Sequence, residues 1–400
     1  MSQRMEKLPN ALGIGVVGLG RAFTLMLPTF ELDARVQLVA ATDPIEAARA
    51  QFECDFDRPT FADIEQLCQD PAVELVYIAS PHQFHAEHVR IAAQYGKHVL
   101  LEKPMAITMA QCSAMVQAMQ QAGKTLIVGH SHSFNAPVLH ARKLIDRGEI
   151  GTVQMIHALQ FTDFLYRARR PEELCTEDGG GVVHSQAAHQ MDVVRLLGAG
   201  LVRSLRAHTQ AWDAVRPTEG AYNALMQFED GCVANLCYSG YGHFDSDVLM
   251  GHMGELGTAK NPANYGAARA KLATWADAEQ EAQAKAQRNY GASSFAAAPT
   301  AAAHQHFGQV IVCGTRGDLR LMPDGVWLHG DTAQRFDALP APDVPRREVV
   351  DEVWAALREG QAALHHGAWA MATTEACLAL LQSSQEQRDI RLQHQVAWGR

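Results

Sequence analysis

Hydrophobic residues follow two different patterns along the chain, and the change falls near residue 129. Before it, short uninterrupted apolar runs alternate with stretches in which apolar residues recur at helical spacing. The runs predict strands at 14–19, 36–42, 74–79, 99–101 and 126–129, and the stretches predict helices at 23–30, 45–52, 64–68, 84–95 and 109–122. Continuous apolar strands separated by helices are typical of a parallel sheet covered on both faces. This part therefore predicts an α/β fold with a doubly wound parallel sheet.

After residue 129 the pattern favours a different architecture. A helix is predicted at 138–147 and a strand at 153–161, and three glycines at 179–181 lead into a helix at 182–197. Strand-like runs follow at 202–209, 221–228, 232–238 and 318–329, separated by turn sequences rich in Asp, Pro and Gly. These elements predict an α+β domain with a mostly antiparallel, open sheet. Residues 258–303, rich in Ala and Gln, are predicted to form a helical insertion or a lid, and their composition indicates no chemistry of their own.

Length, composition and charge restrict the class of protein. The 400 residues predict two domains, 1–130 and 131–400, and 47% hydrophobic residues with 20% charged residues are ordinary for a soluble globular protein. A net charge of -10 provides no electrostatic footprint for nucleic acid or an anionic membrane. The eight cysteines are scattered without a C-x-x-C pair, and no signal peptide or long apolar stretch is evident. We therefore expect a cytoplasmic protein with reduced thiols.

A glycine turn after the first strand indicates a dinucleotide site. Gly18 and Gly20 flank Leu19, so the backbone can approach a pyrophosphate at a helix N-terminus, although Phe23 stands where a third glycine is usual. Asp43 ends the second strand 23 residues after Gly20, a spacing that suits an acid binding the adenine ribose. Its carboxylate would repel a 2′-phosphate, which favours NAD over NADP. The alternative role for Asp43 is a helix N-cap.

Lys103 follows the predicted strand 99–101 at the same sheet edge. Pro104 disfavours helical geometry at Lys103, so the chain leaves the strand extended and the amine reaches the crevice where open α/β sheets bind ligands. Histidines at 82, 85 and 88 raise the question of a metal, but three histidines on one helix rarely form a site, and we expect none. The residues expected to bind the cofactor are Gly18, Leu19, Gly20, Arg21, Ala22, Phe23, Asp43, Ser80, Pro81, His82, His85, Glu102 and Lys103.

Several motifs in this order resemble the Gfo/Idh/MocA oxidoreductases: Gly18-Leu19-Gly20, Asp43, Ser80-Pro81 with His85, Gly96-Lys97-His98-Val99, Glu102-Lys103-Pro104, and Gly179-Gly180-Gly181 with His189 and Asp192. The resemblance covers nearly the whole chain. It implies a nicotinamide cofactor on an N-terminal Rossmann domain, and a C-terminal domain whose open sheet forms the interface of a dimer or tetramer. It also implies hydride transfer at a carbinol carbon, with Lys103 as the active-site lysine and His189 as the acid/base.

The chain departs from the family pattern at Ser185. Family members often have an aspartate four residues before the histidine, and Ser185 occupies that position. Ser185 and His189 are expected to share a helix face, but a hydroxyl cannot raise the pKa of a histidine as a carboxylate does. Asp192, three residues beyond His189, is open to two roles: orienting the histidine, or a surface or capping function.

The substrate expectation comes from four segments, 18–30, 162–174, 179–190 and 238–247, which resemble family members that act on cis-dihydrodiols of aromatic dicarboxylates. The partner implied is a small aromatic dicarboxylate diol. A dianion is best met by forked cations, and three arginines cluster just upstream of the glycine-rich turn. Their alternative role is a solvated loop or an oligomer contact. The expected substrate-binding residues are Arg167, Arg169, Arg170, His132 and Ser185.

Two other functions are compatible with some of these residues and motifs. An NAD-dependent sugar or inositol dehydrogenase of the same family would present the same Lys103 and His189. A non-catalytic NAD-binding regulator is the second alternative, because fold alone does not establish function. The presence of both Lys103 and His189 argues against the regulator, and the arginine cluster argues against the sugar enzyme.

Overall fold

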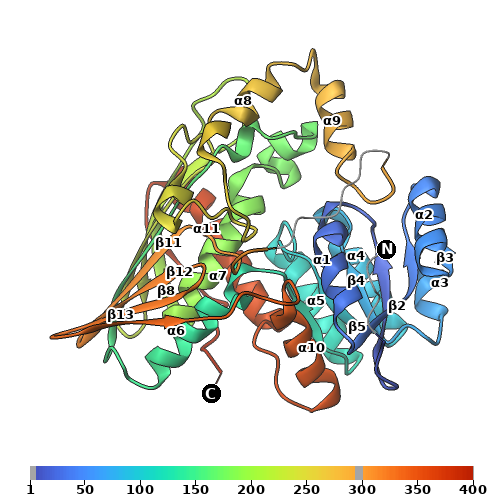
Figure 1. Ribbon diagram of the computed structural model, residues 1–400, viewed down its shortest axis with the longest axis horizontal. Helices are drawn as coiled ribbons and strands as arrows, with labels where there is room; N and C mark the ends of the chain where they lie inside the picture. The colour runs from blue at the N-terminus through green and yellow to red at the C-terminus, as the bar shows by residue number, and fades with distance from the viewer. Residues whose placement is uncertain (1–5, 293–300, 400) are drawn as a thin grey trace. The chain divides into compact units, whose positions relative to one another are not determined.

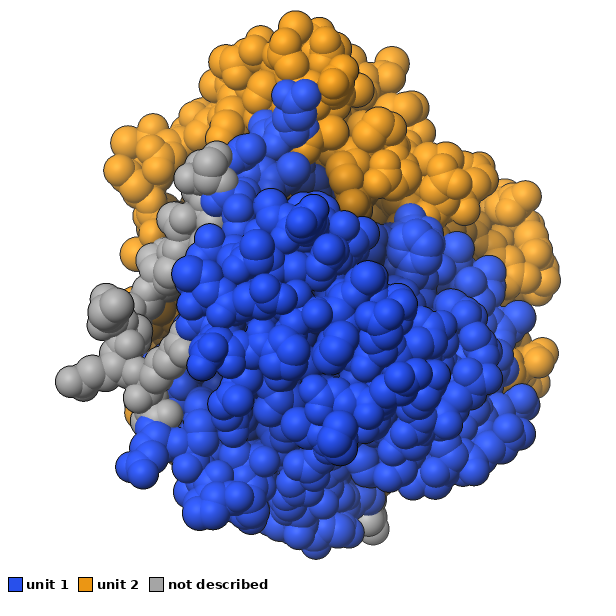
Figure 2. Space-filling view, turned by 90° about the vertical axis from the view of Figure 1, so that its right-hand side faces the viewer, with its two compact units in different colours: residues 1–130, 283–298, 343–371 blue, residues 131–282, 299–342, 372–400 orange. Residues whose placement is uncertain are grey.

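The computed structural model describes residues 6–292 and 301–399 of the chain (Figure 1). The chain divides into two compact units, which Figure 2 distinguishes by colour. Unit 1 consists of residues 1–130, 283–298 and 343–371, and unit 2 consists of residues 131–282, 299–342 and 372–400. Each unit has its own β-sheet.

Unit 1 contains a six-stranded sheet in which every pair of neighbouring strands is parallel. Its strand order is β3 (Thr60–Phe61), β2 (Val36–Thr42), β1 (Leu12–Val17), β4 (Leu75–Ile78), β5 (His98–Leu101) and β6 (Leu126–Val128). All residues of β1 and β4 are buried, as expected for strands covered on both faces. The prediction of a doubly wound parallel sheet is confirmed.

The helices of unit 1 include α1 (Arg21–Leu32), α2 (Glu46–Phe56), α3 (Ile64–Gln69), η1 (His82–Phe84), α4 (His85–Gln94), α5 (Met109–Gln121) and α10 (Arg347–Arg358). Side-chain caps begin two of them, because Asp63 and Thr108 accept the amides of Gln66 and Gln111. The apolar sides of α3, α4 and α5 join the sheet in one buried cluster. After α10, the carbonyl of His365 accepts the Val128 amide, so this segment covers the edge strand β6.

Unit 2 contains a nine-stranded sheet in which only β7 and β10 pair in parallel. Its strand order is β14 (Gln334–Ala338), β13 (Gly325–Gly330), β12 (Gly317–Met322), β11 (Gln309–Gly314), β7 (Val153–Phe161), β10 (Val233–Ser239), β9 (Ala221–Phe228), β8 (Val202–Gln210) and β15 (Ile390–Arg391). The mostly antiparallel sheet is as predicted. The strand-like run predicted at 318–329 forms two strands, because its turn signal at Pro323 and Asp324 reverses the chain between β12 and β13.

Helices lie against one face of the unit 2 sheet (Figure 1). The longer ones are α6 (Ala136–Asp146), α7 (Ala188–Leu197) and α11 (Gly367–Glu386), which extends from unit 1 into unit 2. Every residue of α7 is buried. The insertion carries α8 (Ala267–Leu272) and α9 (Ala278–Ala286), and short helical turns are η2 (His132–Phe134), η3 (Phe164–Tyr166), η4 (Pro171–Leu174), η5 (Thr176–Asp178), η7 (Ser246–Met250) and η8 (Pro262–Asn264).

The predicted helix at 182–197 has two parts. Residues Val183–Ala187 form a π-helix, and α7 continues from it. Among the described helices of both units, none is long and apolar enough to cross a membrane.

Candidate active site

The glycine turn after β1 is held by Asp43. Gly18 has a φ of 94°, and a Cβ there would lie 2.8 Å from the Ser80 amide nitrogen, so only glycine fits. The Asp43 carboxylate accepts the Leu19 amide at 2.7 Å and the Ile45 amide at 2.8 Å. Asp43 therefore joins the turn to the start of α2. Each carboxylate oxygen has further lone-pair capacity, and binding of a ribose diol by Asp43 stays a prediction.

Phe23 replaces the third glycine because this position belongs to an aromatic core. Its side chain is fully buried, and its ring centre lies 5.3 Å from that of Tyr290 and 6.3 Å from that of Phe52. The Tyr290 amide also donates to the Leu19 carbonyl at 3.2 Å. The segment around Tyr290 thus packs directly on the glycine turn within unit 1.

Positive charge gathers at the start of α1. Burial lowers the pKa of Arg21 to about 10, and repulsion from Arg288 and Arg346 adds to the effect. Arg21 and Ala22 form the first turn of α1, where helix geometry already favours an anion. This environment suits the pyrophosphate of a dinucleotide.

His85 connects the loops that follow β4 and β5. It is 1% exposed, with Nδ1 at 3.0 Å from the Pro104 carbonyl oxygen and Nε2 at 3.0 Å from the Ser80 carbonyl oxygen. His88 lies nearby, with Nδ1 at 2.9 Å from the Ser80 hydroxyl. His82 begins the short helix η1 after Pro81. His85 therefore links the backbone after β4 to the backbone after β5, at the carboxyl edge of the sheet.

Burial lowers the pKa of His85 to about 4 from an ordinary value of 6.5. Below pH 6.5 the unfolded chain binds a proton that the folded chain excludes, so stability falls as the pH falls toward 4. Between pH 7.5 and 4.5 we expect wild type to lose about 2–3 kcal/mol more than His85→Asn. Urea unfolding at both pH values measures this difference. The exposed His208→Asn is the control, and an equal pH dependence of wild type and His85→Asn would contradict the prediction.

Lys103 lies at the carboxyl end of β5, two residues past the strand, and is partly buried. Beside it, Glu102 is 7% exposed and accepts the Tyr77 hydroxyl at 2.7 Å. Burial raises the pKa of Glu102, while Arg346, Tyr77 and Lys103 act in the opposite direction. Glu102 is thus anchored in the core of unit 1, and its cofactor role stays a prediction. Lys103 follows β5, which neighbours β4, and β4 neighbours the glycine-turn strand β1.

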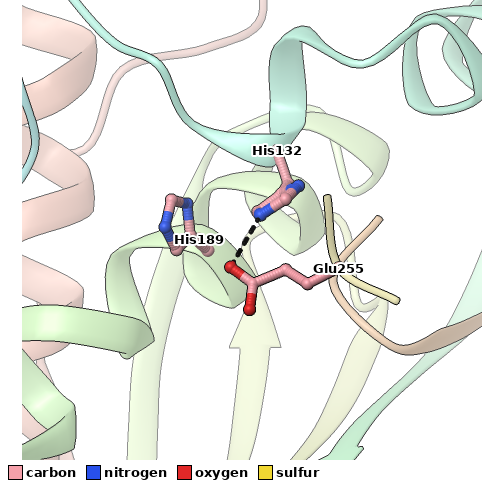
Figure 3. A group of neighbouring side chains, drawn as sticks. All are labelled: His132, His189 and Glu255. Carbon is pink, nitrogen blue, oxygen red and sulfur yellow. Dashed lines mark hydrogen bonds and ion pairs between the residues drawn. The ribbon is translucent and has the colours of Figure 1, made fainter. Parts of the chain in front are cut away.

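In unit 2 two histidines and a carboxylate converge (Figure 3). His132 comes from η2, His189 from α7, and Glu255 from a loop; their potential ligand atoms lie within 4.8 Å of one another. The two imidazole rings meet edge to face at 4.5 Å between centres, and His132 Nε2 lies 3.5 Å from Glu255 Oε1. Both histidines are buried. The structure therefore brings the predicted site residues His132 and His189 together. Glu255 was not predicted as a site residue, because it belongs to none of the sequence motifs.

Ser185 and Asp192 have other partners. The Ser185 hydroxyl donates to the carbonyl of Gly181. Asp192 is buried and accepts the hydroxyls of Ser133 and Thr373, the latter at 2.8 Å. The surface role considered for Asp192 is therefore wrong.

The glycine-rich turn before α7 is shaped by Glu219. Gly181 has a φ of 79°, and a Cβ there would lie 2.1 Å from Glu219 Oε1. That carboxylate also accepts the Val183 amide at 3.0 Å at the start of the π-helix. Burial raises the pKa of Glu219. The turn therefore sets where the π-helix and α7 begin, and with them the position of His189.

The three predicted arginines have different surroundings. Arg167 donates to Asp163 at 3.2 Å and to Thr162 at 2.8 Å. The guanidinium of Arg169 lies 3.6 Å from the centre of the Phe164 ring. Arg170 forms ion pairs with Glu172 at 3.0 Å and with Glu173 at 3.6 Å. The charge of Arg170 is therefore met within its own loop.

Tyr238 joins the arginines to the histidines. Its ring stacks on Phe307 at 5.9 Å, and Phe307 packs against His132 and His189. Burial raises the pKa of Tyr238 well above its usual range, and the nearby Arg167 acts in the opposite direction. Among the described residues the buried Tyr238 hydroxyl has no hydrogen-bond partner. A ligand oxygen would satisfy it.

Comparisons with known proteins agree with the architecture. A family model described as "Oxidoreductase family, NAD-binding Rossmann fold" matches residues 12–130, and "GFO/IDH/MocA C-terminal domain" matches residues 138–260. A 1-carboxy-3-chloro-3,4-dihydroxycyclohexa-1,5-diene dehydrogenase of Comamonas testosteroni is 46% identical over 372 residues, 92% of this chain and 94% of that protein. An inositol 2-dehydrogenase of Saccharopolyspora erythraea is 30% identical over 61% of this chain and 72% of that protein.

Among solved structures, a dehydrogenase of Bordetella bronchiseptica has a TM-score of 0.90 with 36% identity, covering 95% of this chain and 100% of that one. Levoglucosan dehydrogenase in complex with NADH and levoglucosan has a TM-score of 0.71 with 16% identity, covering 96% and 99%. The similarity to the Bordetella dehydrogenase extends over both units. The similarity to levoglucosan dehydrogenase, at 16% identity, supports the fold alone.

Proposed function

Because this chain belongs to the GFO/IDH/MocA oxidoreductases and is an NAD-dependent enzyme, we propose that it oxidises a carboxylated cyclohexadiene cis-dihydrodiol. The relative with 46% identity is named for a cyclohexadiene ring that carries one carboxyl group, one chlorine and two vicinal hydroxyls. The observation that carries the proposal is the environment of Tyr238. The Tyr238 hydroxyl, buried and without a hydrogen-bond partner among the described residues, lies in the electrostatic field of Arg167 and Arg169.

The arginines distinguish this substrate class from a neutral sugar. The contacts of Arg167 among the described residues use two of its five N–H groups, which leaves donors for a carboxylate. Arg169 is 9% exposed, and its guanidinium stacks on Phe164. Two planar cations beside an aromatic wall fit a flat anionic ring. We assign the carboxylate contact to Arg167, with Arg169 beside it, and exclude Arg170 because two glutamates neutralise it.

The residue roles follow from the family motif together with the chemistry of the groups. NAD, when bound, supplies the hydride acceptor. His189 takes the proton of the reacting hydroxyl as a general base. Lys103 donates a hydrogen bond to the same oxygen and stabilises the negative charge that develops there. The hydroxyketone then enolises to a catechol, and this aromatisation makes the oxidation effectively irreversible.

The finer proposal concerns the ring substituents. Segments 18–30, 162–174, 179–190 and 238–247 resemble bacterial phthalate cis-4,5-dihydrodiol dehydrogenase. We propose 4,5-dihydro-4,5-dihydroxyphthalate as the substrate and 4,5-dihydroxyphthalate as the product. The second carboxylate would engage the second cation, Arg169, which supports a dianion over a monoanion.

A substrate panel tests both levels of the proposal. NADH formation is measured at 340 nm with the cis-dihydrodiols of phthalate, 3-chlorobenzoate and unsubstituted benzene, and with myo-inositol and glucose. We expect kcat/KM to be highest for phthalate dihydrodiol and at least a hundredfold lower for the uncarboxylated diol. Preference for the chlorobenzoate diol would contradict the dianion assignment alone. Activity confined to inositol or glucose would contradict the dihydrodiol function.

A further inference from the structure

We propose that Glu255 supplies, next to His132, the carboxylate that Ser185 does not provide, and so orients His189 and stabilises its charged form. This inference rests on the proposed role of His189 as the base. In it, Glu255 and His132 are positioning residues, and they act on the substrate only through His189. Glu255, His132, Ser185 and His189 all belong to unit 2.

The first step is the tautomer of His132. Asn135 Nδ2 lies 2.8 Å from His132 Nδ1 and 2.8 Å from the Gln305 carbonyl oxygen. Because the carbonyl can only accept, the Asn135 side chain must present its NH2 group to both atoms. His132 Nδ1 is then an acceptor, and the ring proton of neutral His132 sits on Nε2. That proton points to Glu255 Oε1, 3.5 Å away.

The same tautomer argues against a metal ion in this cluster. A metal-binding histidine offers a nitrogen lone pair to the ion and usually donates its other N–H to an oxygen. Here the order is reversed: Nδ1 accepts from Asn135, and Nε2 faces Glu255 with its proton. The three groups are therefore arranged for hydrogen bonding and charge stabilisation.

The position of Glu255 is built into the fold. It lies in a hairpin in which Met253 pairs with Ala259. The Gly254 amide donates to the Thr258 carbonyl at 2.8 Å, and the His306 amide donates to the Glu255 carbonyl at 3.2 Å. These backbone bonds fix the loop that carries Glu255, and Figure 3 shows its side chain beside the two histidines.

The hairpin itself is tied to the rest of unit 2. At Gly257, with a φ of 75°, a Cβ would lie 2.1 Å from the Ala303 carbonyl oxygen, so the turn requires glycine. Lys260, just past the hairpin, lies 2.6 Å from Asp245 and 2.5 Å from Asp247. The hairpin is therefore held at both its tip and its base.

Other charged groups lie near Glu255 and the two histidines, and most of the carboxylates among them already have partners. Asp192 accepts two hydroxyls, and Asp163 pairs with Arg167. Burial lowers the pKa of Arg167, but Glu255 and Asp163 more than offset this, and the net pKa is raised. The titratable groups near Glu255 include His132, His189, Arg167 and Tyr238, and also His306, whose amide donates to the Glu255 carbonyl. Glu255 is the negative group of this set that adjoins His189.

The test compares Glu255→Gln with Glu255→Asp. Removing the charge destabilises the His189 imidazolium, so in Glu255→Gln we expect the pKa of His189 to fall by about one unit. We expect kcat to fall about 100-fold, the lower end of what a positioned general base contributes. The acidic limb of the pH–kcat/KM profile should move to lower pH, with KM for NAD unchanged. Glu255→Asp keeps the charge and should keep the wild-type pH profile. Glu229→Gln, which removes an exposed carboxylate paired with Arg203, is the matched control.

A second measurement does not depend on turnover. Histidine 15N shifts, assigned with His132→Asn and His189→Asn, report the tautomer of His132 and the pKa of His189 in protein without substrate. We expect the Nε2–H tautomer in wild type and a lowered His189 pKa in Glu255→Gln. An unchanged His189 pKa, or activity that chelation removes and a divalent metal restores, would overturn the proposal. Failure of wild type to oxidise any dihydrodiol would instead refute the proposed function and leave these shifts interpretable.

A restoring variant provides the last arm of the test. Ser185→Asp in the Glu255→Gln background places a carboxylate where the family usually has one. We expect this double variant to recover at least tenfold in kcat over Glu255→Gln. A double variant no faster than Glu255→Gln would contradict the idea that the two positions supply the same carboxylate.

Discussion

Lys103→Met is expected to lower kcat about a thousandfold. Methionine is close to lysine in length and shape but has no charge and no N–H donor, so the developing alkoxide loses its stabilising hydrogen bond in a partly buried site. Loss of one such donor typically costs 10²–10³ in kcat, about 3–4 kcal/mol of transition-state stabilisation. The hydride step should become fully rate-limiting, so the deuterium isotope effect on kcat should increase. Steady-state kinetics with protiated and C-deuterated substrate measure both effects.

The control for Lys103→Met comes from the same sheet. Lys124 precedes β6 at the amino edge, whereas Lys103 follows β5 at the carboxyl edge, where open sheets bind ligands. Lys124→Met should keep kcat within a factor of two. A Lys103→Met enzyme with wild-type kcat would remove the lysine from the mechanism and would favour the regulator alternative.

The fold of unit 1 was largely predictable because its strands are buried on both faces. A strand such as β4 must be apolar throughout, and that leaves a continuous run in the sequence. No comparable pattern in the sequence indicates that residues 283–298 belong to unit 1, because their place there depends on the packing of Tyr290 on Phe23. A contact between positions 267 residues apart is a property of the packed core and cannot be read from local periodicity.

The residues of the candidate site likewise fall into those that the sequence predicted and those that only the folded structure reveals. Lys103 and His189 were found because they belong to motifs whose spacing is set by single strands and helices. Glu255 lies in an Ala- and Gly-containing loop, and only the hairpin pairing of Met253 with Ala259 brings it to the histidines. Tyr238 could not be singled out from the sequence, because its unpaired hydroxyl is visible only once its buried neighbours are placed.

Ser185 illustrates why a lost motif residue need not mean a lost function. The expectation that Ser185 and His189 share a helix face assumed α-helical spacing, but the segment Val183–Ala187 is π-helical. π-helical turns occur often at functional sites, since they change which side chains face a ligand. Within this turn the Ser185 hydroxyl donates to the carbonyl of Gly181, four residues earlier. A carboxylate from a distant loop then becomes the geometrically available partner for the histidine.

Arg167→Gln is expected to lower kcat/KM for the carboxylated diol about a hundredfold, mainly through KM. Glutamine retains one donor group but no charge and no fork, so a bidentate contact to the ring carboxylate is lost. A hundredfold change corresponds to about 3 kcal/mol, within the range for removing one partner of a desolvated charge pair. Initial rates over a range of diol concentrations separate KM from kcat.

Two comparisons decide whether the effect of Arg167→Gln comes from the substrate carboxylate. Arg170→Gln makes the same change three residues away, where Glu172 and Glu173 already neutralise the guanidinium, and should alter kcat/KM less than threefold. The uncarboxylated benzene dihydrodiol has no group for Arg167 to bind, so wild type and Arg167→Gln should oxidise it equally well. If Arg167→Gln impaired both diols equally, Arg167 would act by supporting Glu255 or the fold, and the anionic-substrate proposal would lose its main physical basis.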